Sequence, residues 1–267
     1  MFERILIAVG ESEAPLRHAA SLLRPRAGGA PSAIASFHVD TKRPGDTLDA
    51  LLERAAAEQA DLLVLGARSH VTARRVAMLA PCSVLVVPDR TELRLKRILV
   101  PVDFSAMSAE ALRVGARIAS VAGGDCAVAA VECDDDPWLD WRESPSYLEE
   151  RLERFVSEAA GDADQYIRCL VEPIERSVGD GPAANIEGTD IAATILSVAA
   201  RLRTTLIVIG TRGRTPAASV LIGSVTERVV RRSPVPVLVV KHAGERLDLL
   251  HSLLERLRNR QPDLVVS

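Results

Sequence analysis

Residues 97–102 read Arg-Ile-Leu-Val-Pro-Val, and residues 4–9 read Arg-Ile-Leu-Ile-Ala-Val. Two further segments recur in the same order along the chain: residues 61–68 as residues 205–212, and residues 81–87 as residues 233–240. Matched segments in matched order predict an internal duplication. We therefore expect two related halves, residues 1–92 and 93–242, followed by an extension at residues 243–267.

The repeated segments are continuous runs of aliphatic and β-branched residues, a pattern typical of strands buried on both faces of a parallel sheet. Helical patterns separate them, at residues 14–23, 47–59, 106–121, 146–159, 189–202 and 219–231. This alternation predicts an α/β fold with two Rossmann-like, doubly wound parallel-sheet domains in tandem.

The two halves differ in length. The first has one additional strand candidate, residues 33–39, whereas the second has two, residues 127–133 and 165–171, with a helix between them. We therefore expect the first domain to lack one helix and one strand. Leucines at helical spacing in residues 243–258 predict an amphipathic helix that docks on the second domain or on a partner.

Composition excludes several classes of protein. The net charge of -3 and the aromatic content of 3% give neither attraction for nucleic acid nor rings for base stacking. The apolar start turns polar at Glu11, and no apolar run is long enough to cross a membrane, so we expect a cytoplasmic protein. The four cysteines form no C-x-x-C pair and predict no metal site.

A glycine pattern follows the strand candidate that ends at Ile209. Gly210-Thr211-Arg212-Gly213 is followed, after nine residues, by Gly223-Ser224-Val225, a G-x-x-G-x9-G-S pattern. Glycine lets a polyphosphate approach the main chain and permits the dihedral angles that point N–H groups inward, so Gly210 and Gly213 would shape the turn. The alternative is a glycine-rich surface loop in which Ser224 only caps the next helix.

The second part of the pattern falls near a helix start. There, near Gly223 and Ser224, the unpaired N–H groups and the positive end of the helix dipole would favour phosphate, and the Ser224 hydroxyl would add one more donor. Arg212 and Arg214 lie where they would reach the outer phosphates.

An acidic residue follows the first strand of the second half. Pro101-Val102-Asp103 stands at the carboxyl end of that strand, where open α/β sheets bind ligands. Asp103 is therefore a candidate ligand contact. Its alternative role is N-cap of the helix at residues 106–121, which Ser105 would serve equally well.

These residues and this order of elements resemble the tandem universal stress proteins, whose ATP-binding branch carries the same G-x-x-G-x9-G-S/T loop. The resemblance covers residues 1–241. It implies Mg2+ and ATP in the second half and dimerisation through the last strand, residues 235–240. The implied contacts are Pro101, Val102, Asp103 and Val131 around adenine and ribose, and Gly210, Arg212, Gly213, Gly223, Ser224 and Val225 around the phosphates.

The first half departs from this family pattern. Gly10 stands in the place of Asp103, Ser69 replaces the second loop glycine, and the interval to the last strand is nine residues shorter. We therefore expect no ATP there, and a first half that imitates the second subunit of a dimer. The acidic and aromatic insertion at residues 132–141 also departs from the family, and we interpret its Asp134–Asp136 run as a solvated loop.

The sequence thus favours an ATP-binding regulatory protein that forms a homodimer and in which nucleotide state changes conformation or partner choice. One alternative is a slow ATPase or self-phosphorylating enzyme, for which Asp103 is the one candidate base. The other is a nucleotide-free scaffold. No catalytic residue and no metal-binding side chain is assigned.

Overall fold

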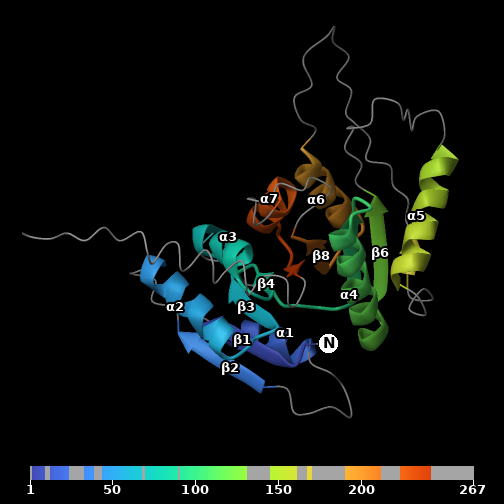
Figure 1. Ribbon diagram of the computed structural model, residues 1–267. Helices are drawn as coiled ribbons and strands as arrows, with labels where there is room; N and C mark the ends of the chain where they lie inside the picture. Colours follow the sequence, from blue (N-terminus) through green and yellow to red (C-terminus); the bar gives the residue numbers. More distant parts are fainter. Residues whose placement is uncertain are drawn as a thin grey trace, which may run out of the picture.

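A single mixed sheet organises the described residues of the chain (Figure 1). The computed structural model describes residues 2–9, 13–23, 33–38, 44–67, 70–89, 91–130, 145–160, 167–169, 190–211 and 223–241. Within them, nine strands are arranged in the order β2-β1-β3-β4-β9-β8-β5-β6-β7. The strands are β1 (Arg4–Val9), β2 (Ala33–His38), β3 (Leu62–Gly66), β4 (Ser83–Val87), β5 (Arg97–Val102), β6 (Asp125–Ala130), β7 (Ile167–Cys169), β8 (Leu206–Gly210) and β9 (Val237–Val240).

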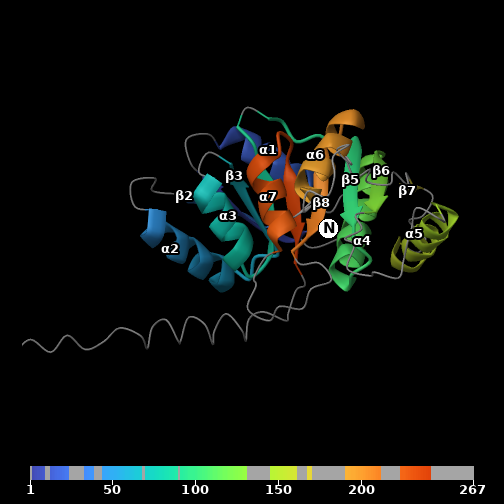
Figure 2. The same ribbon diagram turned by 90° about the horizontal axis from the view of Figure 1, so that it is seen from above.

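Helices cover both faces of this sheet (Figure 2). They are α1 (Ala14–Leu22), α2 (Pro44–Ala57), α3 (His70–Leu79), α4 (Ala106–Ala122), α5 (Pro145–Ala160), α6 (Ile191–Arg201) and α7 (Ser224–Arg232). Side chains of α1, α4 and α5 share one apolar core with the sheet, and side chains of α2, α3, α6 and α7 share the other. Continuous apolar strands are required because both faces are buried. The predicted α/β fold class is confirmed.

The strand order repeats about the centre of the sheet. From one edge it runs β2-β1-β3-β4, and from the other β7 is followed by β6-β5-β8-β9, so β1 corresponds to β5, β3 to β8 and β4 to β9. All pairs are parallel except β4 with β9, where Leu85 pairs with Leu238. Val84 pairs with Val239 and Val86 with Val237, as expected for a two-fold axis passing between the two leucines.

This central pairing corrects one expectation. The two halves share one sheet instead of forming two separate ones. Strand β9 pairs with β8 on one side and with β4 on the other, so a second chain finds no open edge at residues 235–240. Dimerisation through this strand, as implied by the family resemblance, is therefore wrong for the arrangement seen here.

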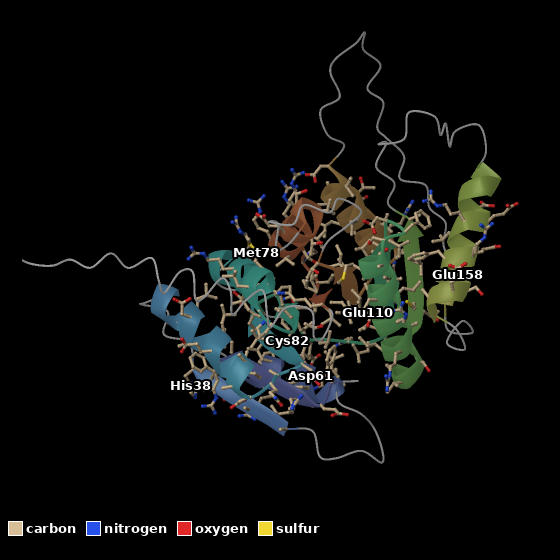
Figure 3. The ribbon with its side chains drawn as sticks, in the orientation of Figure 1. His38, Asp61, Met78, Cys82, Glu110 and Glu158 are labelled. Carbon is tan, nitrogen blue, oxygen red and sulfur yellow. The ribbon has the colours of Figure 1, made fainter. Side chains whose placement is uncertain are left out.

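Polar contacts also join the halves. The buried Lys241 follows β9, and its Nζ donates hydrogen bonds to the carbonyl oxygens of Met78, at 3.2 Å, and Ala80, at 2.7 Å. Met78 lies at the end of α3 (Figure 3), so the ammonium group satisfies carbonyls at a helix C-terminus. An ion pair of 3.0 Å links Arg74 of α3 to Glu227 of α7.

The helices show where sequence patterns succeed and fail. Six of the seven helices match predicted segments, but α3 was not predicted, although Ala73, Val76 and Ala77 recur at helical spacing and are buried. Helix α7 begins at Ser224, not at residue 219. In the described part of the first half, nothing corresponds to α5 and β7. The segment 243–258 lies outside the described residues.

Helix α4 positions the later site. Ser105 is its N-cap, accepting a 3.2 Å hydrogen bond from the amide of Ser108, and Gly123 ends the helix in the left-handed conformation. In its middle, a Cβ on Gly115 would lie 2.6 Å from Cγ2 of Val100, so only glycine allows this close approach to β5. Among the described helices, none is long and apolar enough to span a bilayer.

Candidate functional site

The winding of the second half reverses at β5. Strand β6 lies on one side of β5 and β8 on the other, and ligands of doubly wound sheets bind at the carboxyl ends of such a pair. Pairing of β5 with β6 continues to Val102, opposite Ala130, whereas pairing with β8 stops at Leu99, opposite Ile207. Pro101 follows two residues later and has no N–H to donate, which explains why the ladder to β8 ends early.

Asp103 stands directly after β5. Its Oδ1 accepts hydrogen bonds from the amide of Ser105, at 3.1 Å, and from the hydroxyl of Ser105, at 2.6 Å. Ser105, and not Asp103, caps α4, so the capping role suggested as the alternative for Asp103 is wrong. The carboxylate instead holds the capping serine in place, while being half-buried at the edge of the sheet.

Phe104, between these two residues, has a left-handed backbone with φ of 62°. Such a conformation is costly for a bulky residue and needs support from its surroundings. The ring packs edge-on against Phe155 of α5 with centroids 5.4 Å apart, and the guanidinium of Arg151 lies 4.1 Å from its centroid. The turn that carries Asp103 is thereby tied to α5.

Gly210 ends β8 beside the start of α4. A Cβ there would lie 2.9 Å from the carbonyl oxygen of Met107. The described backbone therefore requires glycine at this position for close packing of β8 against α4, whereas the sequence had suggested a turn as the reason. Gly66, at the corresponding position of β3, meets no atom closer than 4.0 Å.

Hydrogen bonds close the base of the loop between β8 and α7. The amide of Gly223 donates to the carbonyl oxygen of Thr211 at 2.7 Å, and the buried hydroxyl of Thr226 donates to the carbonyl oxygen of Gly210 at 2.8 Å. Two parts of the glycine pattern that are distant in sequence are thus brought together at the carboxyl end of β8.

The N-terminus of α7 opens at this point. Gly223 is its N-cap and offers no side chain to the first-turn amides, so the capping role suggested for Ser224 is wrong. The first amides of any helix have no intrahelical partner, and here they belong to the exposed Ser224 and the half-buried Val225 and their neighbours. This end of the helix favours an anion.

The hydroxyl of Thr211 is an unusual group. Thr211 is 1% exposed, and its Oγ1 is the one buried side-chain oxygen or nitrogen of the described residues that has no hydrogen-bond partner. Buried polar groups are nearly always paired, so an unpaired one next to a helix N-terminus indicates a missing polar contact.

Toward its C-terminal end, α7 forms ion pairs with the residue before α6. Arg232 and Arg228 both contact the carboxylate of Asp190, which caps α6 through the amide of Ala193 at 3.3 Å. The hydrogen bond from Arg232 is the main reason why the pKa of Asp190 lies below its usual value of 3.8. A displacement of α7 would therefore be felt at the start of α6.

The structure places seven of the ten predicted site residues at this edge: Pro101, Val102, Asp103, Gly210, Gly223, Ser224 and Val225. Val131, Arg212 and Gly213 lie outside the described residues, as do Arg214 and the insertion at residues 132–141. Sequence reasoning missed Thr211 and Thr226, although both lie within or beside the glycine pattern. Within the described part of the chain, no group of three metal-ligating side chains is present.

Residues 94–241 match the model of the universal stress protein family. Because this match covers more than half of the chain, the chain belongs to the universal stress protein family. A relative, universal stress protein MJ0531 of Methanocaldococcus jannaschii, is 29% identical over 150 residues, which are 55% of this chain and 82% of the relative.

Solved structures show the same fold across nearly the whole chain. The functionally unknown protein PA1789 of Pseudomonas aeruginosa PAO1 aligns with a TM-score of 0.61 and 17% identity, over 97% of this chain and 98% of its own. A universal stress protein of Archaeoglobus fulgidus DSM 4304 aligns with a TM-score of 0.55 and 19% identity, over 90% of this chain and 96% of its own. At these identities the likeness concerns the fold alone.

Proposed function

We propose that this chain is a cytoplasmic ATP-binding regulatory protein that holds one adenine nucleotide, with Mg2+, in its second half. The observation that carries this proposal is the buried Thr211 hydroxyl without a partner, beside the first amides of α7 at the carboxyl end of β8. A phosphate oxygen is the acceptor that both kinds of donor lack. The family membership supports the same assignment.

Different residues would bind different parts of the nucleotide. Thr211, Gly223, Ser224 and Val225 would hold the phosphates. Asp103, whose Oδ1 already accepts from Ser105, keeps its second oxygen for a ribose hydroxyl. Pro101 and Val102 would line the adenine side with the chain near Val131, while Arg212 and Gly213 would complete the phosphate side; Mg2+ would offset the phosphate charge.

The first half, residues 1–92, would act as the packing partner of residues 93–242. The pairing of β4 with β9 makes one chain the equivalent of a dimer, with one nucleotide instead of two. Binding stabilises the folded chain by mass action, by about 2.7 kcal/mol at a ligand concentration one hundred times Kd. Through Arg228 and Arg232, α7 would pass nucleotide state to α6 and to a protein partner.

One contact favours a second candidate, self-phosphorylation. The Ser105 hydroxyl donates a 2.6 Å hydrogen bond to Asp103, as a nucleophile does to its base. In such a step the Ser105 oxygen would bond to the γ-phosphorus of ATP, its proton would pass to Asp103, and ADP would leave.

The test is to purify the protein without added nucleotide, denature it and identify the released small molecules. We expect an adenine nucleotide, and a higher Tm of the wild type with Mg-ATP that the Gly223→Asp variant does not show. If the protein releases no nucleotide and its Tm does not rise with Mg-ATP, the proposal is refuted and the nucleotide-free scaffold remains. Steady release of ADP from added ATP would point to an ATPase, and a phosphoryl group on Ser105 to self-phosphorylation.

A further inference from the structure

The corresponding strands β2 and β6 differ in how well they are covered. In β6, Cys126 and Val128 are fully buried, because α5 lies over that part of the sheet and β7 pairs with the outer edge. In β2 all four inner residues are only partly buried. The described part of the first half has no counterpart of α5 or β7, and α1 has nine residues where α4 has seventeen.

The missing cover leaves an apolar patch on the α1 face. Phe2, Leu22 and Ile34 pack against the core on that face but remain partly exposed; we call these three residues the Phe2 patch. They are neighbours, because the amide of Phe2 donates to the carbonyl oxygen of Leu23 at 3.3 Å. The carbonyl oxygen of Glu3 in turn accepts from Ala33 at 2.9 Å. The patch lies at the amino ends of β1 and β2.

The chain leaves β9 at this same edge of the sheet. The amide of Lys241 donates to the hydroxyl of Ser83, the first residue of β4, at 3.2 Å. Strands β4, β3, β1 and β2 are neighbours in that order and all start at this edge. At about 4.8 Å per strand, roughly 14 Å separate the start of β4 from the start of β2.

The segment that follows Lys241 has the length and the pattern to cover the patch. Residues 243–258 place leucines at 247, 250, 254 and 257, with more at 249 and 253, and polar residues between them. As a helix these residues would extend about 24 Å, more than the distance to be crossed. We propose that residues 243–258 fold back as a helix on the Phe2 patch and cover the first half as α5 covers the second.

Hydrogen exchange on the full chain tests this docking. One variant replaces three leucines (L250S, L253S, L254S), and its matched control replaces two polar residues of the same segment without changing net charge (E255S, R256S). A third variant, Ile34→Glu, places a charge in the patch itself. We expect residues 247–257 to exchange slower than a free peptide by about tenfold or more in the wild type and control, and as a free peptide in Ile34→Glu.

The leucine variant should in turn speed exchange at residues 2–9 and 33–38, where the control does not. Exchange of residues 247–257 at the free-peptide rate in the wild type would overturn the proposal. So would protection that is lost when a species of twice the chain's mass is diluted to the monomer, because the segment would then cover a second copy.

Discussion

The two halves use the same strand order but differ in where strand pairing ends at the point where the winding reverses. In the first half, β1 pairs with β3 up to Ala8, opposite Leu65. In the second half, Pro101 stands at the position of Ala8, and the pairing of β5 with β8 ends before it. The first half connects β3 to α3 by residues 67–69, and the second connects β8 to α7 by residues 211–223. The same fold thus supplies a packing partner with a short connection after β3 and a candidate binding site with a long connection after β8.

The largest effect is expected where the halves join. Leu85 and Leu238 are both 0% exposed and face each other across β4 and β9. Leu85→Ala and Leu238→Ala should each lower the free energy of unfolding by about 2–5 kcal/mol, because each leaves a cavity. Urea unfolding measures both. Because the residues are in contact, the double variant should deviate from additivity, and strict additivity would argue against a shared core.

The glycines that end β3 and β8 form a matched pair. Gly210→Ala should destabilise the chain by about 1–3 kcal/mol, since its Cβ would lie 2.9 Å from the main chain of Met107. Gly66→Ala has room and should be neutral or slightly stabilising. Equal effects in thermal unfolding would contradict the close packing of β8 against α4.

Exchanging alanine and proline at positions 8 and 101 tests why the pairing of β5 with β8 is shorter than the pairing of β1 with β3. Ala8 pairs with Phe37 on one side and Leu65 on the other, so Ala8→Pro should remove a ladder hydrogen bond and cost about 1–3 kcal/mol. Pro101→Ala restores a donor in β5 and should slow hydrogen exchange near Ile209. If Pro101→Ala left hydrogen exchange near Ile209 unchanged, proline would not be the cause of the shorter ladder.

The smallest effect concerns the ion pairs between α6 and α7. The pKa of Asp190 is lower in the folded chain than its ordinary value of 3.8. The contribution of the Asp190 carboxylate to folding stability is therefore present above pH 3.8 and is lost as pH falls through the pKa of the folded state. Asp190→Asn keeps a capping residue but loses the charge. The Tm difference between wild type and variant should therefore shrink as pH is lowered from 7 to below 3.8. A difference independent of pH would exclude the ion pairs as its cause.

The sequence predicted the strands and the α/β class because a buried parallel strand is apolar along its whole length, as in β8 and β9. It also placed Asp103 and Gly210 at the carboxyl ends of their strands, because the apolar runs before them end there. It could not reveal the antiparallel pairing of β4 with β9, which depends on contacts between distant segments. Nor could it reveal the unpaired hydroxyl of Thr211 or the hydrogen bond from Thr226 to Gly210, because no local pattern marks them.

One titration addresses the central claim, that only the second half holds nucleotide. Aligning Leu85 with Leu238 places His70 opposite Gly223, so His70→Asp and Gly223→Asp put the same charge at the start of α3 and of α7. Calorimetric titration with Mg-ATP should give one site per chain in the wild type and in His70→Asp, and none in Gly223→Asp. Two sites per chain, no site, or wild-type binding by Gly223→Asp would contradict the account.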